Sequence, residues 1–125
     1  LRTIRISPKK ANLVADMVRN KDAVSAMDFL SFLPKKAARP LRQAIGSAVA
    51  NAVNNFKQDK NKLYVKSIVI GHGATYHRFR CVSRGRAHPI RKKTSHISIE
   101  LGLRAPDAEV STAKKSKTKK TPSIK

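Results

Sequence analysis

Residues 63–70 have the sequence LYVKSIVI, which is rich in β-branched side chains and short for a helix. Residues 97–101 have the sequence ISIEL, in which apolar and polar side chains alternate. Both patterns are typical of β-strands, and the alternation indicates a strand with one buried face. The residues between them keep an extended character but have little apolar bulk. The simplest prediction is one long antiparallel hairpin.

The hairpin is predicted to turn within residues 83–89, SRGRAHP. An arm of about 15 residues, at roughly 3.3 Å per residue, spans about 50 Å, whereas a compact domain of about 100 residues has a radius of gyration of about 13 Å. We therefore expect the hairpin to project from the body of the protein. Because isolated two-stranded ribbons are marginally stable in water, we expect the projecting hairpin to become ordered by contact with the molecule that it lies against.

Two helices are predicted near the start of the chain. Ser7 and Pro8 suit the cap and the first position of a helix that ends near Asn20. Asp22 is expected to cap a second, short helix that continues to about Leu30. The apolar face of the first helix is expected to consist of Leu13, Val14, Met17 and Val18.

A longer third helix is predicted from Pro34, with apolar residues that recur every 3.6 residues through Val53. Many of these residues are Ala, which lets a neighbouring element approach closely. Pro40 lies inside the predicted helix, where it lacks an N–H group and crowds the preceding turn. We therefore expect a kink or a restart at Pro40.

Charge is the strongest functional signal. The 125 residues include 28 Lys and Arg but 7 Asp and Glu, which gives a formal net charge of +21. Residues 60–99 contain ten basic residues and no acidic one. Such a charge attracts polyanions, so nucleic acid is the first partner to expect. We expect no membrane binding, because the chain has no Trp and no apolar run of about 18 residues.

The sequence predicts no enzyme, no cofactor and no metal site. Cys81 is the single cysteine, and four residues of extended strand would place His77 about 13 Å from it, too far to share one ion. No carboxylate lies between Asp59 and Glu100, so the chain has no clustered acids for metal-dependent or nucleophilic catalysis. The remaining histidines are expected to form hydrogen bonds or to face phosphate: His72, His88 and His96.

Alternate residues of the outgoing arm share a face. One face is predicted to carry Tyr76, Arg78, Arg80, Val82 and Arg84, and the other His77, Phe79 and Cys81. The return arm adds Arg91, Lys92 and Lys93. A guanidinium group binds phosphate through two parallel hydrogen bonds, so the pattern predicts phosphate binding. A ribbon that is merely solvated would carry charges of both signs.

Two residues near the turn have alternative interpretations. Gly85 either lets a nucleotide or another chain approach the backbone closely, or it supplies a positive φ in the turn. Pro89 either wedges against a base or ends the strand pairing.

Five motifs occur in order along the chain: ISPKKA at 6–11, LVAD at 13–16, LYVK at 63–66, RGRA at 84–87 and IRKKTSHI at 90–97. Together they closely resemble the large-subunit ribosomal protein twenty-two family of bacterial or organellar type, from about Ile4 to Leu101. The resemblance implies an α+β fold in which three helices pack on a small three-stranded antiparallel sheet, with a long projecting β-hairpin at about 71–96. We expect residues 1–103 to form this domain and residues 104–125 to form a basic, disordered tail.

The resemblance further implies a structural constituent of the large ribosomal subunit that binds rRNA, supports assembly and lines the polypeptide exit tunnel with its hairpin. The implied partners are large-subunit rRNA, neighbouring ribosomal proteins including protein four, and the nascent polypeptide, in bacterial cytoplasm or an organelle matrix. The implied rRNA-binding residues are Lys9, Lys10, Arg78, Arg80, Arg91, Lys92 and Lys93. The implied tunnel-lining tip consists of Arg84, Gly85, Arg86, Ala87, His88 and Pro89.

Two prolines depart from the family pattern: Pro89 stands where an arginine is usual, and Pro40 lies inside the third helix. Composition alone also allows another class, an architectural DNA-binding protein with basic β-arms and a proline wedge. Such proteins place two short arms on a dimer, whereas one long arm is predicted here.

Overall fold

The computed structural model describes residues 1–104 of the chain. Its helices are α1 (Pro8–Asp16), α2 (Ala23–Phe32), α3 (Ala38–Phe56) and the short 3-10 helix η1 (Lys60–Lys62), and its strands are β1 (Leu63–Cys81) and β2 (Ala87–Leu103). The predicted α+β class is confirmed. The tail predicted at 104–125 lies outside the described residues, except for Arg104. In the described part of the chain, no helix is long and apolar enough to cross a membrane.

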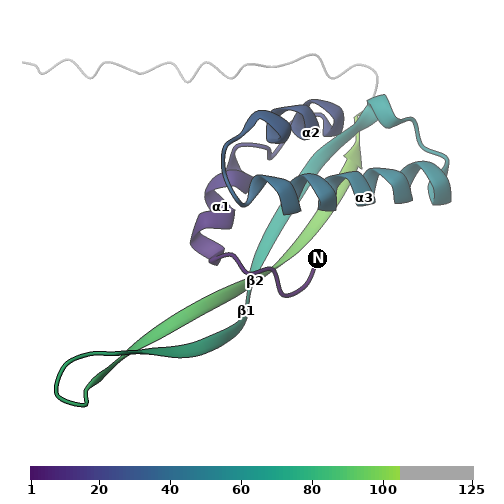
Figure 1. Ribbon diagram of the computed structural model, residues 1–125. Helices are drawn as coiled ribbons and strands as arrows, with labels where there is room; N and C mark the ends of the chain where they lie inside the picture. Colours follow the sequence, from purple (N-terminus) through teal and green to yellow (C-terminus); the bar gives the residue numbers. More distant parts are fainter. Residues whose placement is uncertain (105–125) are drawn as a thin grey trace, which may run out of the picture.

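The two strands form the predicted long hairpin. They pair antiparallel from Leu63 opposite Leu103 to Cys81 opposite Ala87. Figure 1 shows that the helices gather against one end of this ribbon, while the other end projects away from the body as an arm. The hairpin therefore both carries the core and extends beyond it.

The expected three-stranded sheet is not confirmed, because among residues 1–104 the sheet has two strands, β1 and β2. The N-terminal segment lies beside β2 and bonds to it at two separate points. Ile4 and Ser95 exchange backbone hydrogen bonds of 2.9 and 3.0 Å, and Leu1 and Ile97 exchange two of 2.8 Å. Thr3 has a φ of 54°, which interrupts the extended backbone that a strand requires. Its N–H instead donates to Nδ1 of His96 at 2.9 Å.

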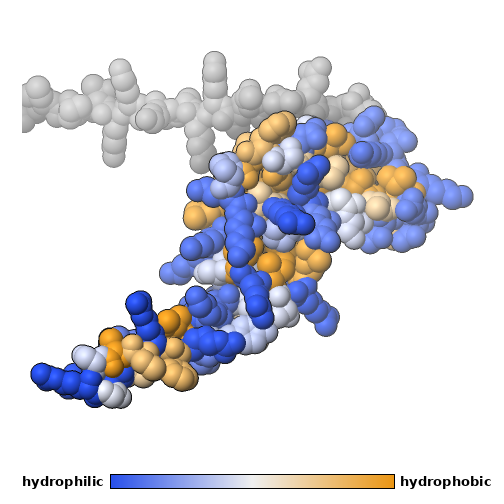
Figure 2. All heavy atoms as spheres, viewed as in Figure 1, coloured by the Kyte–Doolittle hydropathy of each residue, from blue (hydrophilic) through white to orange (hydrophobic). Residues whose placement is uncertain are grey.

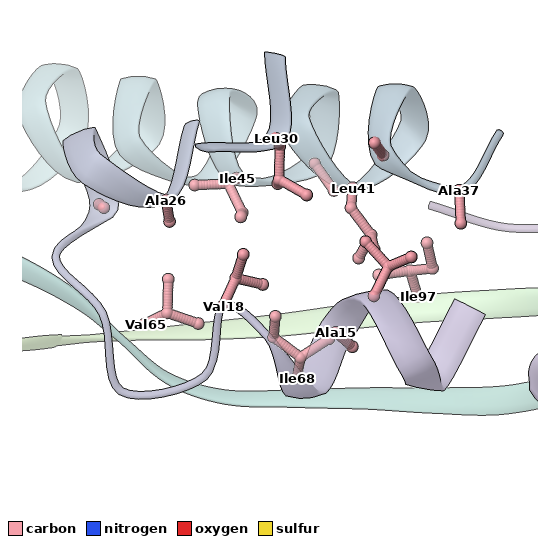
Figure 3. Close-up of a cluster of buried hydrophobic side chains, with 14 of the residues drawn as sticks. Ala15, Val18, Ala26, Leu30, Ala37, Leu41, Ile45, Val65, Ile68 and Ile97 are labelled. Carbon is pink, nitrogen blue, oxygen red and sulfur yellow. The ribbon is translucent and has the colours of Figure 1, made fainter. Parts of the chain in front are cut away.

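The core lies between the helices and the body end of the hairpin. Leu41 and Ile45 of α3 are fully buried, as is Val65 of β1. Figure 3 shows the α3 side chains pointing toward the strands, with Val18 between the layers. Complete burial of a side chain of this size stabilises the fold by about 1.5–3 kcal/mol. The alanine-rich stripe of α3 packs here, as its periodicity predicts.

The first two helices differ from the prediction at their ends. α1 ends at Asp16, and residues 17–20 form a turn in which Asn20 has a φ of 60° and donates its N–H to the carbonyl of Val65 at 3.0 Å. Asp22 occupies the cap position of α2, but its side chain makes no capping bond. Its carboxylate instead accepts a 2.7 Å hydrogen bond from Arg104. Asn20 and Asp22 thus bond to β1 and to the residue that follows β2, instead of forming the helix ends that the sequence predicts.

The third helix begins four residues later than predicted, at Ala38, and Pro34 lies in the preceding loop. Pro40 is therefore in the first turn, where a backbone N–H has no partner inside the helix. The missing N–H removes no helical hydrogen bond, so the expected kink is wrong. The helix ends where Lys57 adopts a left-handed φ of 51°.

A β-bulge marks the boundary between the body and the arm. The register shifts between His72 and Thr75, so that Gly73 and Ala74 lie opposite the single residue Thr94. Thr94 is 1% exposed, whereas side chains beyond it on the arm are exposed. A Cβ atom at Gly73 would collide with the Thr94 hydroxyl, so this position requires glycine.

Candidate nucleic-acid interface

A groove of about 1000 Å³ lies where the arm leaves the body. Its walls come from α1, from the loop between α2 and α3, and from the first part of the arm. These segments are far apart in sequence, so the groove exists only in the folded chain. The lining residues are Arg5, Ile6, Ser7, Lys10, Leu13, Val14, Met17, Pro34, Lys35, Lys36, Ala37, Tyr76, Arg78, Arg91, Lys92, Lys93 and Thr94.

The groove is strongly cationic. Eight of its lining residues are Lys or Arg, and no Asp or Glu lines it among the residues that the structure describes. The ion pairs found in residues 1–104 all lie elsewhere: Asp16 with Arg19, Asp59 with Lys62, and Asp22 with Arg104. The positive charge of the groove is thus left for an external anion.

Apolar side chains lie between these charges. Leu13 and Met17, which were predicted to face the core, are 69% and 44% exposed and line the groove. α1 packs on the body through Ala11, Val14 and Ala15, and Val18 of the following turn is also buried. Leu13 of α1 and Met17, directly after α1, stay exposed next to these buried residues in the sequence. Tyr76 is 38% exposed, and the guanidinium carbon of Arg5 lies 5.7 Å from the centre of its ring.

The arm presents two different faces. Residues opposite one another in an antiparallel pair share a face, so Arg78 and Arg80 lie with Ile90 and His88. The other face carries His77, Phe79 and Cys81 with Arg91, Pro89 and Ala87. Figure 2 shows hydrophilic residues at the far end of the arm and apolar ones beside them. The basic residues of the arm therefore lie on both of its faces rather than on one.

The turn at the tip is shorter than predicted. It spans residues 82–86 and is closed by a 2.8 Å hydrogen bond from the N–H of Val82 to the carbonyl of Arg86. Arg84 and Gly85 have φ values of 57° and 68°. Gly85 thus supplies a positive φ, and nothing in the described chain lies close to its Cα hydrogens. Val82 and Arg84, which were predicted to share a strand face with Arg78 and Arg80, therefore lie in the turn and not in β1.

The last three residues of the predicted tip are in β2, where Ala87, His88 and Pro89 pair with Cys81, Arg80 and Phe79. Pro89 therefore does not end the strand pairing. A two-stranded ribbon has one outward-facing edge on each strand, and such an edge accommodates a residue without an N–H.

The structure brings together five of the seven predicted rRNA-binding residues. The groove is lined by Lys10, Arg78, Arg91, Lys92 and Lys93, whereas Lys9 and Arg80 do not line it. Three further basic residues line the groove that were not predicted from the sequence: Arg5, Lys35 and Lys36. The pair Lys35-Lys36 directly after Pro34 is a visible local signal, but Arg5 carries none, because its importance depends on contact with Tyr76.

The fold and the groove define a polyanion-binding protein: a small α+β body with a projecting basic hairpin and a cationic groove at its base. The family model for ribosomal protein L22p/L17e matches residues 1–102, and the chain belongs to this family. It is a structural protein of the large ribosomal subunit, located in the ribosome.

Bacterial relatives support this assignment. The Large ribosomal subunit protein uL22 of Fusobacterium nucleatum is 49% identical over 100 residues, which cover 80% of this chain and 90% of the relative. The protein of the same name from Mesoplasma florum is 48% identical over 99 residues, which cover 79% and 88%. That of Mycoplasma mycoides is 50% identical over 99 residues, which cover 79% and 89%.

Proposed function

We propose that this chain binds large-subunit rRNA through the groove and through both faces of the arm. The observation that carries the proposal is the continuity of the cationic surface: Arg78, Arg91 and Lys92 belong to the groove and also to the arm. The proposed contact residues are Lys9, Lys10, Arg78, Arg80, Arg91, Lys92 and Lys93, to which the groove adds Arg5, Lys35 and Lys36.

The proposed contacts are made mainly to phosphate and to the shape of folded RNA. Helical RNA of the A form hides its base edges in a deep, narrow major groove, so side chains on a ribbon reach its backbone first. Lysine and arginine without carboxylate partners suit this role, since no internal ion pair has to be broken on binding.

We further propose that the arm enters the subunit and lines the polypeptide exit tunnel with its tip, Arg84, Gly85, Arg86, Ala87, His88 and Pro89, close to protein four and the nascent chain. Family membership and the projection of the arm away from the body support this placement. Residues 1–103 would act as a single rRNA-binding unit. Its role is structural rather than enzymatic, and the bacterial relatives favour the cytoplasm over an organelle matrix.

Salt dependence tests the rRNA proposal. The logarithm of the association constant for large-subunit rRNA should fall with the logarithm of salt concentration by about 0.7 to 0.9 per phosphate contact. The double variant Arg78→Ala and Arg80→Ala should lower this slope by about 1.5. The double variant Lys57→Ala and Lys60→Ala removes the same charge away from the groove and arm and should leave the slope nearly unchanged. Equal slopes for all three proteins would remove Arg78 and Arg80 from the contact surface.

Sedimentation separates this proposal from the architectural DNA-binding alternative. In a sucrose gradient of cell lysate, we expect the chain to travel with the large ribosomal subunit. Recovery with the nucleoid instead would overturn the rRNA proposal.

A further inference from the structure

The groove contains more apolar surface than phosphate binding requires. Leu13 and Met17 remain 69% and 44% exposed there, and Tyr76 remains 38% exposed although Arg5 lies over its ring. Large apolar side chains in a concave site, surrounded by a few oriented polar groups, are typical of a pocket that encloses a ligand. A flat cationic surface would suffice for phosphate alone.

We propose that the groove encloses an unpaired segment of RNA, with at least one base inserted against Tyr76, Leu13 and Met17 and with the flanking phosphates bound by Lys35, Lys36 and Lys92. This proposal rests on the proposed rRNA binding and adds that the groove binds an unpaired part of the RNA.

The chemistry of an unpaired nucleotide matches both parts of the groove. A base has flat, weakly polar faces that stack on aromatic rings and on guanidinium planes, and each nucleotide carries one phosphate. Tyr76 and Arg5 supply one ring and one guanidinium group, 5.7 Å apart, and the cationic rim supplies the phosphate partners. A volume of about 1000 Å³ is sufficient for more than a single base.

Duplex RNA fits the groove less well. Its bases are stacked inside the helix, so only phosphates and riboses would reach the rim, and the apolar floor would remain uncovered. An acidic peptide would satisfy the charges of the rim, but it lacks the planar faces that match Tyr76 and Arg5. The arrangement therefore favours single-stranded RNA over both.

The test uses the full chain and a ten-nucleotide single-stranded RNA that contains 2-aminopurine. Stacking of the probe base on Tyr76 should change its fluorescence on binding. Tyr76→Leu should abolish most of this change and weaken binding about tenfold, the order expected for one stacked base. Tyr76→Phe keeps the ring and should retain both properties.

Phe79 provides the matched control. It is an exposed aromatic residue of the same strand, 74% accessible, and it does not line the groove. Phe79→Leu should leave the fluorescence change intact and affinity within about twofold. The rim is tested by Lys35→Ala with Lys36→Ala, which should weaken binding of the single strand more than the equally charged double variant Lys57→Ala with Lys60→Ala.

Three results would overturn the inference: an equal loss in Tyr76→Leu and Phe79→Leu, a duplex of the same length that binds as tightly as the single strand, or a poly-glutamate peptide that displaces the RNA from the wild-type chain but not from Tyr76→Leu. The proposed function has a separate readout. If the wild-type chain binds large-subunit rRNA and Tyr76→Leu binds it equally well, the rRNA proposal stands and the base-binding groove does not.

Discussion

The hydroxyl of Thr94 donates a 2.6 Å hydrogen bond to the backbone carbonyl of Ala74, across the bulge at which the arm begins. Thr94 is almost completely buried, and Gly73 on the opposite strand leaves just enough space for its side chain. In the bulge, the Thr94 hydroxyl therefore donates the hydrogen bond that a backbone N–H would donate to the Ala74 carbonyl in a regular antiparallel pair.

Thr94→Val should destabilise the fold by about 1–3 kcal/mol, because it leaves the Ala74 carbonyl without its partner while keeping the shape of the side chain. Chemical denaturation measures the loss. Thr75→Val is the matched control, because Thr75 follows Ala74 directly and its side chain is exposed. The free energy of unfolding of this variant should differ from that of the wild type by less than about 0.5 kcal/mol. Equal effects in the two variants would show that the hydrogen bond contributes nothing.

The body should fold without the arm. The core consists of residues of the helices and of the turns next to them, together with Leu63, Val65, Ile68 and Ile97 of the strands. These strand residues all lie on the body side of the bulge. Thr75 and Lys93 are a register pair, so residues 76–92 can be replaced by a two-residue Asn-Gly turn. The shortened chain should keep a cooperative thermal transition and a free energy of unfolding within about 1 kcal/mol of the full chain's. A non-cooperative transition would mean that the arm contributes to the core.

The pKa of Asp59 should lie below its ordinary value of 3.8, because the carboxylate accepts a hydrogen bond from Lys62 and is attracted by its charge. The same contact raises the pKa of Lys62 above 10.5. The pair thus favours the folded state between these two values, and its contribution is lost as the pH falls below 3.8 or rises above 10.5. Both groups are exposed, so the effect on stability is small.

NMR titration of the Asp59 carboxyl group checks this pair directly. Lys62→Ala should return the pKa to about 3.8, whereas Lys66→Ala should leave it lowered. A pKa that does not respond to Lys62→Ala would show that the pair does not form in solution.

The tip should affect passage through the tunnel rather than peptide-bond formation. Arg84 and Arg86 lie on either side of Gly85 in the exposed turn. If the proposed placement of the tip is correct, their charged groups face rRNA phosphate or a passing peptide. With both changed to Ala, we expect assembly and basal elongation to remain nearly normal and pausing on arrest peptides to change about twofold or more, the size of effect expected from loss of two exposed charge contacts.

Ribosome profiling distinguishes the outcomes for the tip variant. Unchanged arrest would limit the tip to a scaffolding role. A uniform slowing at every codon would place its effect at the catalytic centre, contrary to the prediction. The double variant Lys57→Ala with Lys60→Ala is the control, because it removes the same two positive charges away from the tip. It should show normal arrest.

Local sequence was sufficient to predict the three helices and the long hairpin, but not the number of strands in the sheet. The 3.6-residue period of α3, the β-branched run at 63–70 and the alternation at 97–101 each identify an element from its own residues, because burial on one face imposes a period on the side chains. The absence of acids in residues 60–99 likewise indicates a polyanion-binding arm, since charge is a property of composition. The resemblance to the ribosomal family likewise rests on short motifs spread from residue 6 to residue 97, and the family model matches residues 1–102.

Long-range contacts decided the rest, because their free energies depend on partners that no local pattern specifies. Asp22 pairs with Arg104 instead of capping its helix, and the carbonyl of Val65 takes the N–H of Asn20. Leu1 and Ile4 bond to β2, and the positive φ of Thr3 interrupts the extended backbone between them. Above all, the groove joins Arg5, residues 35–36 and the base of the arm, and only tertiary packing brings these cations and the ring of Tyr76 into one concave site.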